Sequence, residues 1–309
     1  MGLLDGKVAI VTGAGRGIGR GEALLLAAHG ARVIVNDVGG EWDGSGADQR
    51  PAQQVVDEIA AAGGEAAANY DDVADFAAAG RMVQQAIDTW GRIDILVNNA
   101  GILRDKMIFN MDESDWDAVI RVHMKGHFAP TRHVCAHWRN LSKESGEAAN
   151  GRIVNTSSTS GLLGNVGQSN YGAAKAGIAA FAQIVSMEMR KYGVTVNAIA
   201  PAARTRMTEN TFGDLMKAGD FDQWDPENVA PIVCFLATDA AADITGQVFY
   251  TSGGIVQLYQ GWNSIEEIRK DARWTVEELV EKVPAMFRDK PKGYAPPQSL
   301  LRQDVTANK

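Results

Sequence analysis

Tyr171 and Lys175 are the residues of this chain whose types and spacing most directly suggest chemistry. Residues four apart on a helix share one face, so the phenol and the ammonium can converge on one ligand. A free tyrosine has a pKa of about 10 and is a poor base, but a neighbouring cation favours the phenolate and lowers that pKa. Ser158 precedes both at the end of an apolar run and could hold a substrate oxygen. An ordinary surface pair has the same tyrosine–lysine spacing, and only the surrounding pattern separates the two interpretations.

A glycine-rich segment, TGAGRGIG at residues 12–19, is the second candidate site. It follows an apolar run and opens a stretch of helical period, so its glycines would let the backbone turn sharply and approach a pyrophosphate at the helix N-terminus. Glycine is favoured in any tight turn, however, so the motif alone is ambiguous. The residues of this segment predicted to bind a dinucleotide are Gly13, Arg16, Gly17, Ile18 and Gly19.

Asp37 gives the glycine-rich segment more weight as a dinucleotide site. It ends the second apolar run, about where a carboxylate binds the adenosine ribose hydroxyls in such sites. A carboxylate there repels a 2′-phosphate, so Asp37 favours NAD over NADP. Arg16 favours NADP instead, because a cation in the turn could bind that phosphate. We give Asp37 precedence, since a desolvated like-charge contact is costly.

Seven short apolar runs are predicted to be the strands that position these residues. They are residues 7–12, 31–37, 65–70, 92–99, 152–158, 193–200 and 247–252. The runs are almost continuously apolar, as expected for strands covered on both faces of a parallel sheet. Segments of helical period lie between them, and repeated right-handed βαβ units give a doubly wound sheet. We therefore expect an α/β fold of the Rossmann type, with a seven-stranded parallel sheet and helices on both faces.

Residues 1–260 are predicted to form a single dinucleotide-binding catalytic domain. Residues 261–309 are predicted to form a C-terminal helical extension that acts as a lid or a dimer arm. Two capping-box patterns predict short helices in the extension, and they are Ser264 with Glu267 and Thr275 with Glu278. Two polar stretches predict surface loops in the main domain, and they are residues 39–51 and 141–151.

The composition of the chain argues against several classes of function. The chain has 309 residues, 45% of them hydrophobic, and a formal net charge of −8, which argues against a general nucleic-acid or anionic-membrane binder. Its two cysteines, Cys135 and Cys234, have no paired spacing, so neither a disulfide framework nor a zinc ribbon is implied. No signal-like or transmembrane-length run is present. These features predict a cytoplasmic protein.

Several motifs in one order make the chain resemble the short-chain dehydrogenase/reductase family over residues 5–258. The motifs are TGAGRGIG (12–19), NNAG (98–101), the Ser158–Tyr171–Lys175 set and the Asn197–Pro201 turn. The resemblance implies that Ser158, Tyr171 and Lys175 carry the chemistry on a secondary alcohol, and that Tyr171 and Lys175 also contact the cofactor. By position, it implies further cofactor contacts at Asp72, Val73, Asn99, Ala100, Gly101 and Thr205.

Longer segments narrow the resemblance to the dehydrogenase part of the peroxisomal multifunctional enzymes of type 2. They are NDVGGEWDGSG, ANYDDV, NNAGILRDK, WDAVIRVHMKG and IAPAARTRMTE. This subgroup implies NAD-dependent oxidation of a (3R)-3-hydroxyacyl-CoA with a fatty acyl or sterol side chain. It also has a histidine at the position of His123, where many family members have an active-site asparagine, so His123 is a fourth candidate catalytic residue. The resemblance further implies a homodimer or homotetramer, built through helices predicted over residues 112–140 and 170–192.

Three alternatives stay open at this point. An NADPH-dependent 3-oxoacyl-(acyl carrier protein) reductase would share nearly every motif, although Asp37 argues against it. A 17β-hydroxysteroid dehydrogenase would act on a steroid in place of an acyl-CoA. A non-catalytic dinucleotide sensor would have no need of the tyrosine–lysine pair. The histidine pairs 123/127 and 133/137 could suggest a metal, but no carboxylate or third ligand accompanies them, so we predict no metal site.

Overall fold

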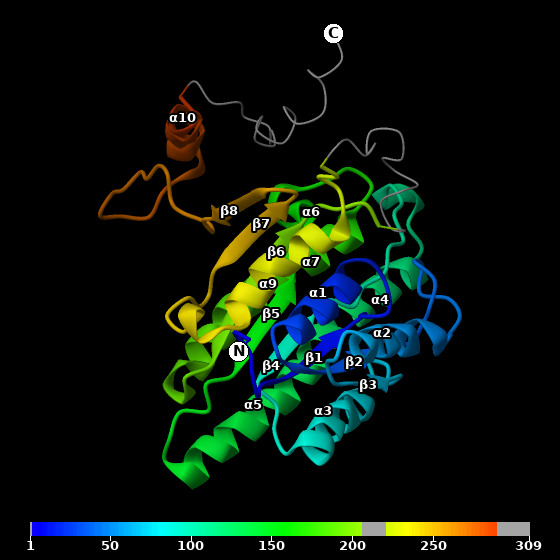
Figure 1. Ribbon diagram of the computed structural model, residues 1–309. Coiled ribbons are helices and arrows are strands. Elements are labelled where there is room, and N and C mark those ends of the chain that lie inside the picture. The colour runs from blue at the N-terminus through cyan, green and yellow to red at the C-terminus, as the bar shows by residue number, and fades with distance from the viewer. Residues whose placement is uncertain (1, 206–220, 289–309) are drawn as a thin grey trace. The chain divides into compact units, whose positions relative to one another are not determined.

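The computed structural model describes residues 2–205 and 221–288 of the chain. The chain divides into two compact units, Met1–Tyr259 and Gln260–Lys309. The first unit is a twisted sheet with helices on both faces (Figure 1). Part of the predicted C-terminal extension, residues 289–309, lies outside the described residues.

Eight strands form one sheet in the order β3-β2-β1-β4-β5-β6-β7-β8, and the first seven are parallel. The parallel strands are β1 (Val8–Thr12), β2 (Arg32–Asn36), β3 (Ala66–Asn69), β4 (Ile95–Asn98), β5 (Arg152–Thr156), β6 (Thr195–Pro201) and β7 (Val248–Ser252). The strand order reverses between β1 and β4, and ligands of doubly wound sheets bind at the carboxyl ends of the strands beside such a reversal. The predicted α/β fold is therefore confirmed.

The predicted count of seven strands is wrong, because β8 (Ile255–Tyr259) adds an eighth strand antiparallel to β7. Gly253 has a φ of +53°, which lets the chain reverse within two residues of β7. β8 lies at the edge of the sheet and is exposed along almost its whole length. It is therefore not covered on both faces, whereas the other strands were predicted from the apolar runs expected of strands that are.

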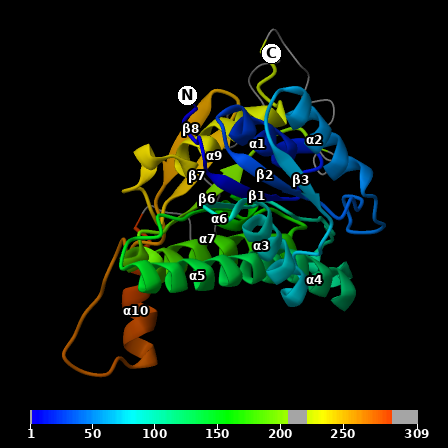
Figure 2. The same cartoon turned by 60° about the horizontal axis from the view of Figure 1, so that its bottom comes forward.

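Helices cover the two faces of the sheet (Figures 1 and 2). One face packs against α1 (Gly17–Ala28), α2 (Arg50–Ala61) and α9 (Ala230–Ala237). The other packs against α3 (Phe76–Trp90), α5 (Gly126–Ser145) and α7 (Ser169–Met189). Along β1, Ala9 and Val11 face the first layer, while Val8 and Ile10 face the second, so each central strand is buried on both sides.

Shorter elements connect this framework. α4 (Glu113–Ile120) runs through a π-helical turn, Arg121–Lys125, into α5. α6 (Thr159–Leu163) follows β5 and precedes α7. The 3-10 turns are Ile108–Asn110, Arg190–Tyr192, Pro226–Val229 and Asp239–Ala241.

Two local predictions need correction. The loop predicted at residues 141–151 starts later, because α5 continues to Ser145 and ends at Gly146 in a left-handed conformation. In the second unit, α10 (Val276–Met286) begins with the predicted capping box of Thr275 and Glu278. No helix begins at Ser264, whose hydroxyl bonds to the carbonyl of Glu266 in a local turn.

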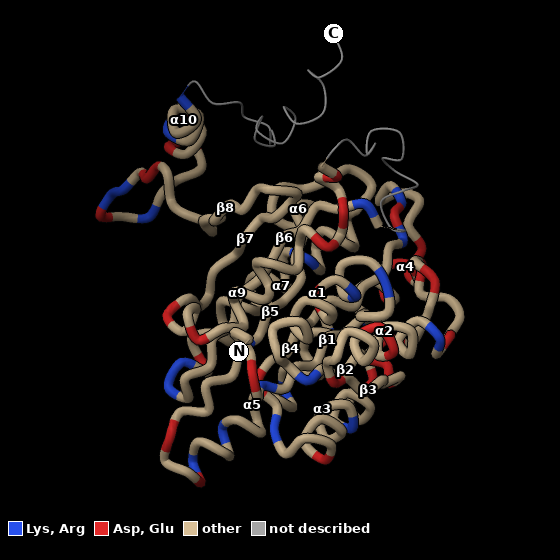
Figure 3. The backbone as a smooth tube through the Cα atoms, in the orientation of Figure 1, with Lys and Arg blue, Asp and Glu red and all other residues tan. Residues whose placement is uncertain are grey.

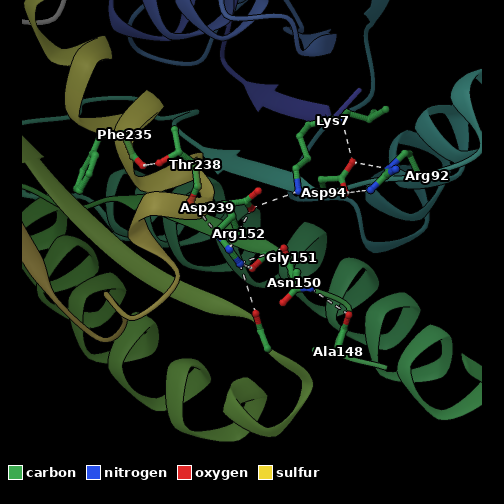
Figure 4. Close-up of polar contacts among 12 residues, drawn as sticks. Lys7, Arg92, Asp94, Ala148, Asn150, Gly151, Arg152, Phe235, Thr238 and Asp239 are labelled. Atoms are coloured by element: carbon green, nitrogen blue, oxygen red, sulfur yellow. Dashed lines mark hydrogen bonds and ion pairs between the residues drawn. The ribbon is translucent and has the colours of Figure 1, made fainter. Parts of the chain in front are cut away.

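A partly exposed network of hydrogen bonds and ion pairs joins the amino ends of the central strands (Figure 4). The backbone amide of Val8 in β1 donates to Asp94 at 2.9 Å, and Asp239 forms ion pairs with Lys7 and Arg152. Asp94 accepts two hydrogen bonds from Arg92, at 2.9 and 2.7 Å. Arg152, at the start of β5, donates to the carbonyl oxygens of Asn150 and Gly151 at 3.0 and 3.1 Å. Because these residues lie at the opposite ends of the strands from the glycine-rich turn, their role is to hold the strands together.

Charged residues are mixed over the helices and loops of the chain (Figure 3). Acidic and basic positions neighbour one another there, and many are joined in ion pairs such as Arg20 with Glu58 and Arg81 with Asp71. Among the described residues, no helix is long and apolar enough to cross a membrane.

Candidate active site

Tyr171 and Lys175 lie one turn apart on α7, and the Lys175 ammonium is 5.4 Å from the centre of the tyrosine ring. Lys175 is buried, and its Nζ donates to the Thr156 carbonyl oxygen at the end of β5, 2.6 Å away. Burial lowers the pKa of Lys175 to about 7. Ser158 caps α6 and is hydrogen-bonded through its side chain to Tyr171. The structure thus brings together the three residues that sequence analysis placed at the centre of the chemistry.

The acidity of Tyr171 differs from expectation. Burial raises the pKa of its phenol to about 12, and the hydrogen bond with Ser158 opposes that rise. Lys175, whose Nζ lies 5.4 Å from the centre of the ring, does not offset this effect of burial. Burial also weakens the positive charge of Lys175, since its own pKa is about 7. The chain alone therefore keeps Tyr171 neutral at physiological pH.

His123 lies in the π-helical turn between α4 and α5, fully buried beside the phenol. Its ring centre is 5.2 Å from that of Tyr171, edge to face. Its Nε2 lies 2.8 Å from the carbonyl oxygen of Ile102. Burial and the nearby Lys175 hold the pKa of His123 well below its usual value, so the ring is neutral. Its part in a proton relay stays a prediction.

Gly101 shows how closely His123 is packed. A Cβ atom at Gly101 would lie 2.4 Å from Cε1 of the histidine ring, so no larger residue fits there without moving the ring. The glycine predicted to contact the cofactor thus also makes room for His123.

The glycine-rich turn has the geometry of a cradle for a ligand. Gly13 has a φ of +63°, and a Cβ atom there would lie 2.8 Å from Cα of Ala100. A Cβ atom at Gly19 would lie 2.3 Å from the carbonyl oxygen of Gly13. Gly17 has a φ of +54°, and a Cβ atom there would lie in ordinary contact with Cγ2 of Thr205, at 3.7 Å. The turn is closed toward the protein and open at the start of α1, where a pyrophosphate would bind.

Hydrogen bonds of Asn99 hold this turn against the end of β4. Its side-chain amide donates to the carbonyl oxygens of Thr12 and Gly13 at 3.0 and 3.1 Å. The Thr12 hydroxyl accepts from the backbone amides of Asn99 and Ala100 at 3.0 and 3.2 Å. Asn99 and Ala100 therefore support the predicted cofactor site by fixing the shape of the turn.

Asp37 lies directly beside the turn, as predicted. Its two carboxylate oxygens accept from the backbone amides of Gly15 and Gly39 at 2.8 and 2.6 Å. These bonds aim the carboxylate at the mouth of the turn and leave it partly exposed. Arg16 bends toward the same loop, with Nη1 3.5 Å from the Gly40 carbonyl oxygen. An anion fixed at this point can accept hydrogen bonds from hydroxyl groups of a bound ligand.

The remaining predicted cofactor residues surround this region. Asp72 forms an ion pair with Arg121, and Val73 is buried against Gly126. Both follow β3, which pairs with β2 beside Asp37. Ile18 is only partly exposed and packs on the core, so its side chain anchors α1. Among the described residues, no group of three or more histidine, cysteine or acidic side chains is placed to hold a metal.

The segment after β4 that packs against the start of α7 has no signal in the sequence. Asp105 accepts a hydrogen bond from the Gln168 side chain at 2.6 Å, and Asn170 donates to the Arg104 carbonyl oxygen at 2.9 Å. These contacts bring the loop after β4 against the start of α7. The partners are 63 and 66 residues apart in the chain, so no spacing signal could have revealed them.

Comparison with known proteins agrees with this geometry. Residues 7–215 match the family model described as short chain dehydrogenase. The chain is 44% identical over 310 residues to hydroxyacyl-CoA dehydrogenase ChsB1 of Mycobacterium tuberculosis, covering 98% of this chain and 94% of that protein. It is also 44% identical to peroxisomal multifunctional enzyme type 2 of Drosophila melanogaster over 84% of this chain, but it spans only 40% of that longer protein.

A solved structure is similar over nearly the whole chain. A short chain dehydrogenase from Mycobacterium avium superposes with a TM-score of 0.85 and 53% sequence identity. The match covers 96% of this chain and 99% of that one.

Proposed function

The chain belongs to the short chain dehydrogenase family, and on that premise we propose that it oxidises the 3-hydroxyl of a (3R)-3-hydroxyacyl-CoA with NAD. Its membership makes it an oxidoreductase that uses a nicotinamide dinucleotide. The single observation that carries the proposed chemistry is the cluster of Ser158, Tyr171 and Lys175 at the carboxyl ends of β5 and the start of α7. The names of the relatives support an acyl-CoA as the substrate.

In this proposal some residues bind the cofactor and others act on the substrate. The turn at Gly13–Gly19 would hold the pyrophosphate and Asp37 the adenosine ribose, while Tyr171 and Lys175 face the nicotinamide end. NAD, when bound, supplies the acceptor for the hydride that leaves the substrate carbon. Ser158 donates a hydrogen bond to the substrate oxygen, and Tyr171 takes the hydroxyl proton as general base. Lys175, on the same face of α7, would relay that proton outward.

The preference for NAD rests on the Asp37 carboxylate. Both its oxygens are already bonded to backbone amides of the turn region, so it cannot swing aside to admit a 2′-phosphate without losing two hydrogen bonds. Arg16 is the feature that favours the alternative, an NADPH-dependent 3-oxoacyl-(acyl carrier protein) reductase. A comparison of the two cofactors therefore decides between these functions.

We also infer a symmetric dimer through the layer of α5 and α7. Large apolar side chains on these helices are exposed, among them Phe128, Ile184 and Met187 at 44%, 51% and 71%. Apolar surface concentrated on adjacent helices is typical of contacts between subunits. Substitution of Met187 by aspartate should lower the mass measured by light scattering to that of a smaller oligomer.

The test of the proposed function mixes purified protein with NAD or NADP and a (3R)-3-hydroxyacyl-CoA, and follows the absorbance of the reduced nicotinamide. The proposal expects NAD reduction, with little response to NADP and little to the (3S) isomer. A 17β-hydroxysteroid with NAD, and a 3-oxoacyl carrier thioester with NADPH, serve as rival substrates. Faster turnover of either rival would show that the rival, and not the (3R)-3-hydroxyacyl-CoA, is the substrate. Binding of NAD without turnover of any of the three compounds would indicate a dinucleotide sensor.

A further inference from the structure

The loop between β2 and α2, the blue segment that joins them in Figure 1, reaches across the sheet to the segment after β4. Its two ends meet beside β2, where the Asp48 amide donates to the Val38 carbonyl oxygen at 3.1 Å. The backbone amide of Leu103, after β4, donates to the Trp42 carbonyl oxygen at 3.0 Å. In the sheet, β1 lies between β2 and β4. Residues 39–48, which we call the strap, therefore span the carboxyl end of β1, where the glycine-rich turn begins.

Arg104 holds the tip of the strap against the segment after β4. Its Nε donates to the Asp43 carbonyl oxygen at 3.1 Å. On the next residue of the strap, a Cβ atom at Gly44 would lie 3.1 Å from Cδ1 of Ile102. Because Ile102 is buried, the tip lies against an apolar side chain that is itself fixed in the protein. A side-chain hydrogen bond and an apolar contact therefore fasten the tip across the end of β1.

The tip is folded on itself, and a glycine lies on each side of it. The Glu41 amide donates to the Ser45 carbonyl oxygen at 2.7 Å. The Asp43 carboxylate accepts from the Ser45 amide and hydroxyl at 2.9 and 2.7 Å. Gly40 precedes this turn, and Gly46 follows it with a φ of +72°. Glycine changes its backbone angles at little steric cost, so these positions suit hinges about which a compact tip moves as a unit.

Arg104 also joins the strap to the helix that carries Tyr171. Its carbonyl oxygen accepts from the Asn170 side chain at 2.9 Å, and the buried Asn170 directly precedes Tyr171 in α7. Its Nη1 lies 3.9 Å from Asp115, on the side away from the strap bond. The ammonium of the neighbouring Lys106 bonds to Asp115 at 2.6 Å. One residue therefore holds the strap with its side chain and the start of α7 with its main chain.

We propose that the strap closes over the adenosine half of the bound dinucleotide, and that its tip must move away from Arg104 for the dinucleotide to enter or leave. The inference rests on the dinucleotide site of the proposed function. The strap begins at that site, because Asp37 accepts from the Gly39 amide at 2.6 Å. Arg16 of the glycine-rich turn lies 3.5 Å from the Gly40 carbonyl oxygen. Since Arg104 acts through the strap, it is a positioning residue for the cofactor.

The first test follows binding and release of NADH by the full chain with stopped-flow fluorescence. Arg104→Met removes the bond to the strap but keeps the main-chain bond to Asn170. If the strap has to open, both the association and the dissociation rate constants should rise by a similar factor. That factor should be about 3- to 10-fold, the effect of one hydrogen bond on an equilibrium, and the dissociation constant should change little.

Lys106→Met is the matched control for this variant. It removes a cation from the same loop without touching the bond to the strap, so it reproduces any effect of lost charge on an anionic dinucleotide. Both NADH rate constants should stay close to those of the wild type. The melting temperatures of the two variants show whether a change in rate comes from loss of the fold.

The second test locks the strap with a disulfide. A Cβ atom at Gly44 would lie 3.8 Å from Cβ of Ile102, which is the usual separation across a disulfide. The variant that combines Gly44→Cys with Ile102→Cys is oxidised either without cofactor or with NADH bound, and mass spectrometry verifies the bond. The oxidised protein should neither take up nor release NADH on the time scale of the reduced protein. Dithiothreitol should restore both rates, and each single variant should be insensitive to oxidation.

Four outcomes would count against these inferences, and they differ in what they contradict. Equal NADH association rates in the oxidised and reduced double variant would overturn the role of the strap. Faster dissociation without faster association in Arg104→Met, or no change in either rate, would also overturn it, because the strap would then be a fixed wall. Gated binding in a protein that oxidises no secondary alcohol would contradict the proposed function and leave the strap intact. A protein that binds neither NADH nor NADPH would contradict both.

Discussion

Lys175 and Thr156 are joined by a buried hydrogen bond of 2.6 Å, from the lysine Nζ to the threonine carbonyl oxygen. A second hydrogen bond, of 2.7 Å, is donated by the Ser157 hydroxyl, just after β5, to the carbonyl oxygen of Lys175 in α7. Together they fasten α7 to the end of β5. The lysine therefore has a structural attachment that fixes its head beside Tyr171, in addition to the charge that chemistry would use.

The burial of Lys175 should make stability depend on pH. Its pKa is lowered from 10.5 to about 7, so between these values the unfolded chain binds more protons than the folded one. The free energy of unfolding should therefore rise as pH increases from about 7 toward 10. Urea unfolding across that range measures this slope.

Lys175→Met is the variant that isolates this contribution. It has no ionisable head, so its unfolding free energy should rise less steeply over the same pH range. Lys191→Met serves as the control, because Lys191 is solvent-exposed on a 3-10 turn. Equal slopes in the wild type and in Lys175→Met would show that the buried ammonium does not titrate in this range.

Tyr171→Phe should lower kcat about 10²- to 10⁴-fold for an alcohol substrate, since it removes only the group that takes the proton. The ring still packs edge to face on His123, so the fold should be kept. NADH binding followed by fluorescence, and the melting temperature, should stay close to the wild-type values. Tyr70→Phe, at an exposed position, should change none of these. Near-normal turnover by Tyr171→Phe would remove Tyr171 from the role of base.

The sequence predicted those parts of the fold and site that depend on local patterns. The seven parallel strands were recognised because they are buried on both faces, whereas β8 escaped notice because it is exposed along the sheet edge. The residues at 158, 171 and 175 were found because a short segment contains them. Asp105 was not found, because its contact with Gln168 depends on the packing of two loops 63 residues apart in the chain. Tertiary packing also decides the ionisation of Tyr171, which no spacing encodes.

Asp37→Ala should reduce the discrimination between the two cofactors. Removal of a charged acceptor for the ribose hydroxyls should cost about 1.5–3 kcal/mol of binding free energy, so NADH affinity should fall about 10- to 150-fold. NADPH affinity should rise, because the anion that repels its 2′-phosphate is gone. Asp37→Asn keeps the shape of the side chain without its charge, and should lie between the wild type and the alanine variant. The dissociation constants of both reduced cofactors provide the check, and an unchanged ratio in both variants would place the ribose elsewhere.

Glu22 gives a prediction that is independent of catalysis. It is fully buried on α1, and neither of its carboxylate oxygens has a hydrogen-bond partner among the described residues. Burial raises its pKa from 4.5 to about 8. Between these pH values the folded chain holds a proton that the unfolded chain loses. The contribution of Glu22 to stability is therefore greatest at low pH, and declines as pH rises from about 4.5 to 8.

Glu22→Gln keeps nearly the same shape without the ionisable group, and should abolish that decline. Its unfolding free energy should exceed that of the wild type by more at pH 8 than at pH 5, because the wild type then pays for keeping a carboxyl neutral or for burying its charge. Glu65→Gln, at an exposed position before β3, should show no such pH-dependent difference. If Glu22→Gln instead differs from the wild type by the same amount at both pH values, the carboxyl at position 22 is not held neutral. Its oxygens would then have to be solvated in the folded protein, contrary to the full burial of Glu22.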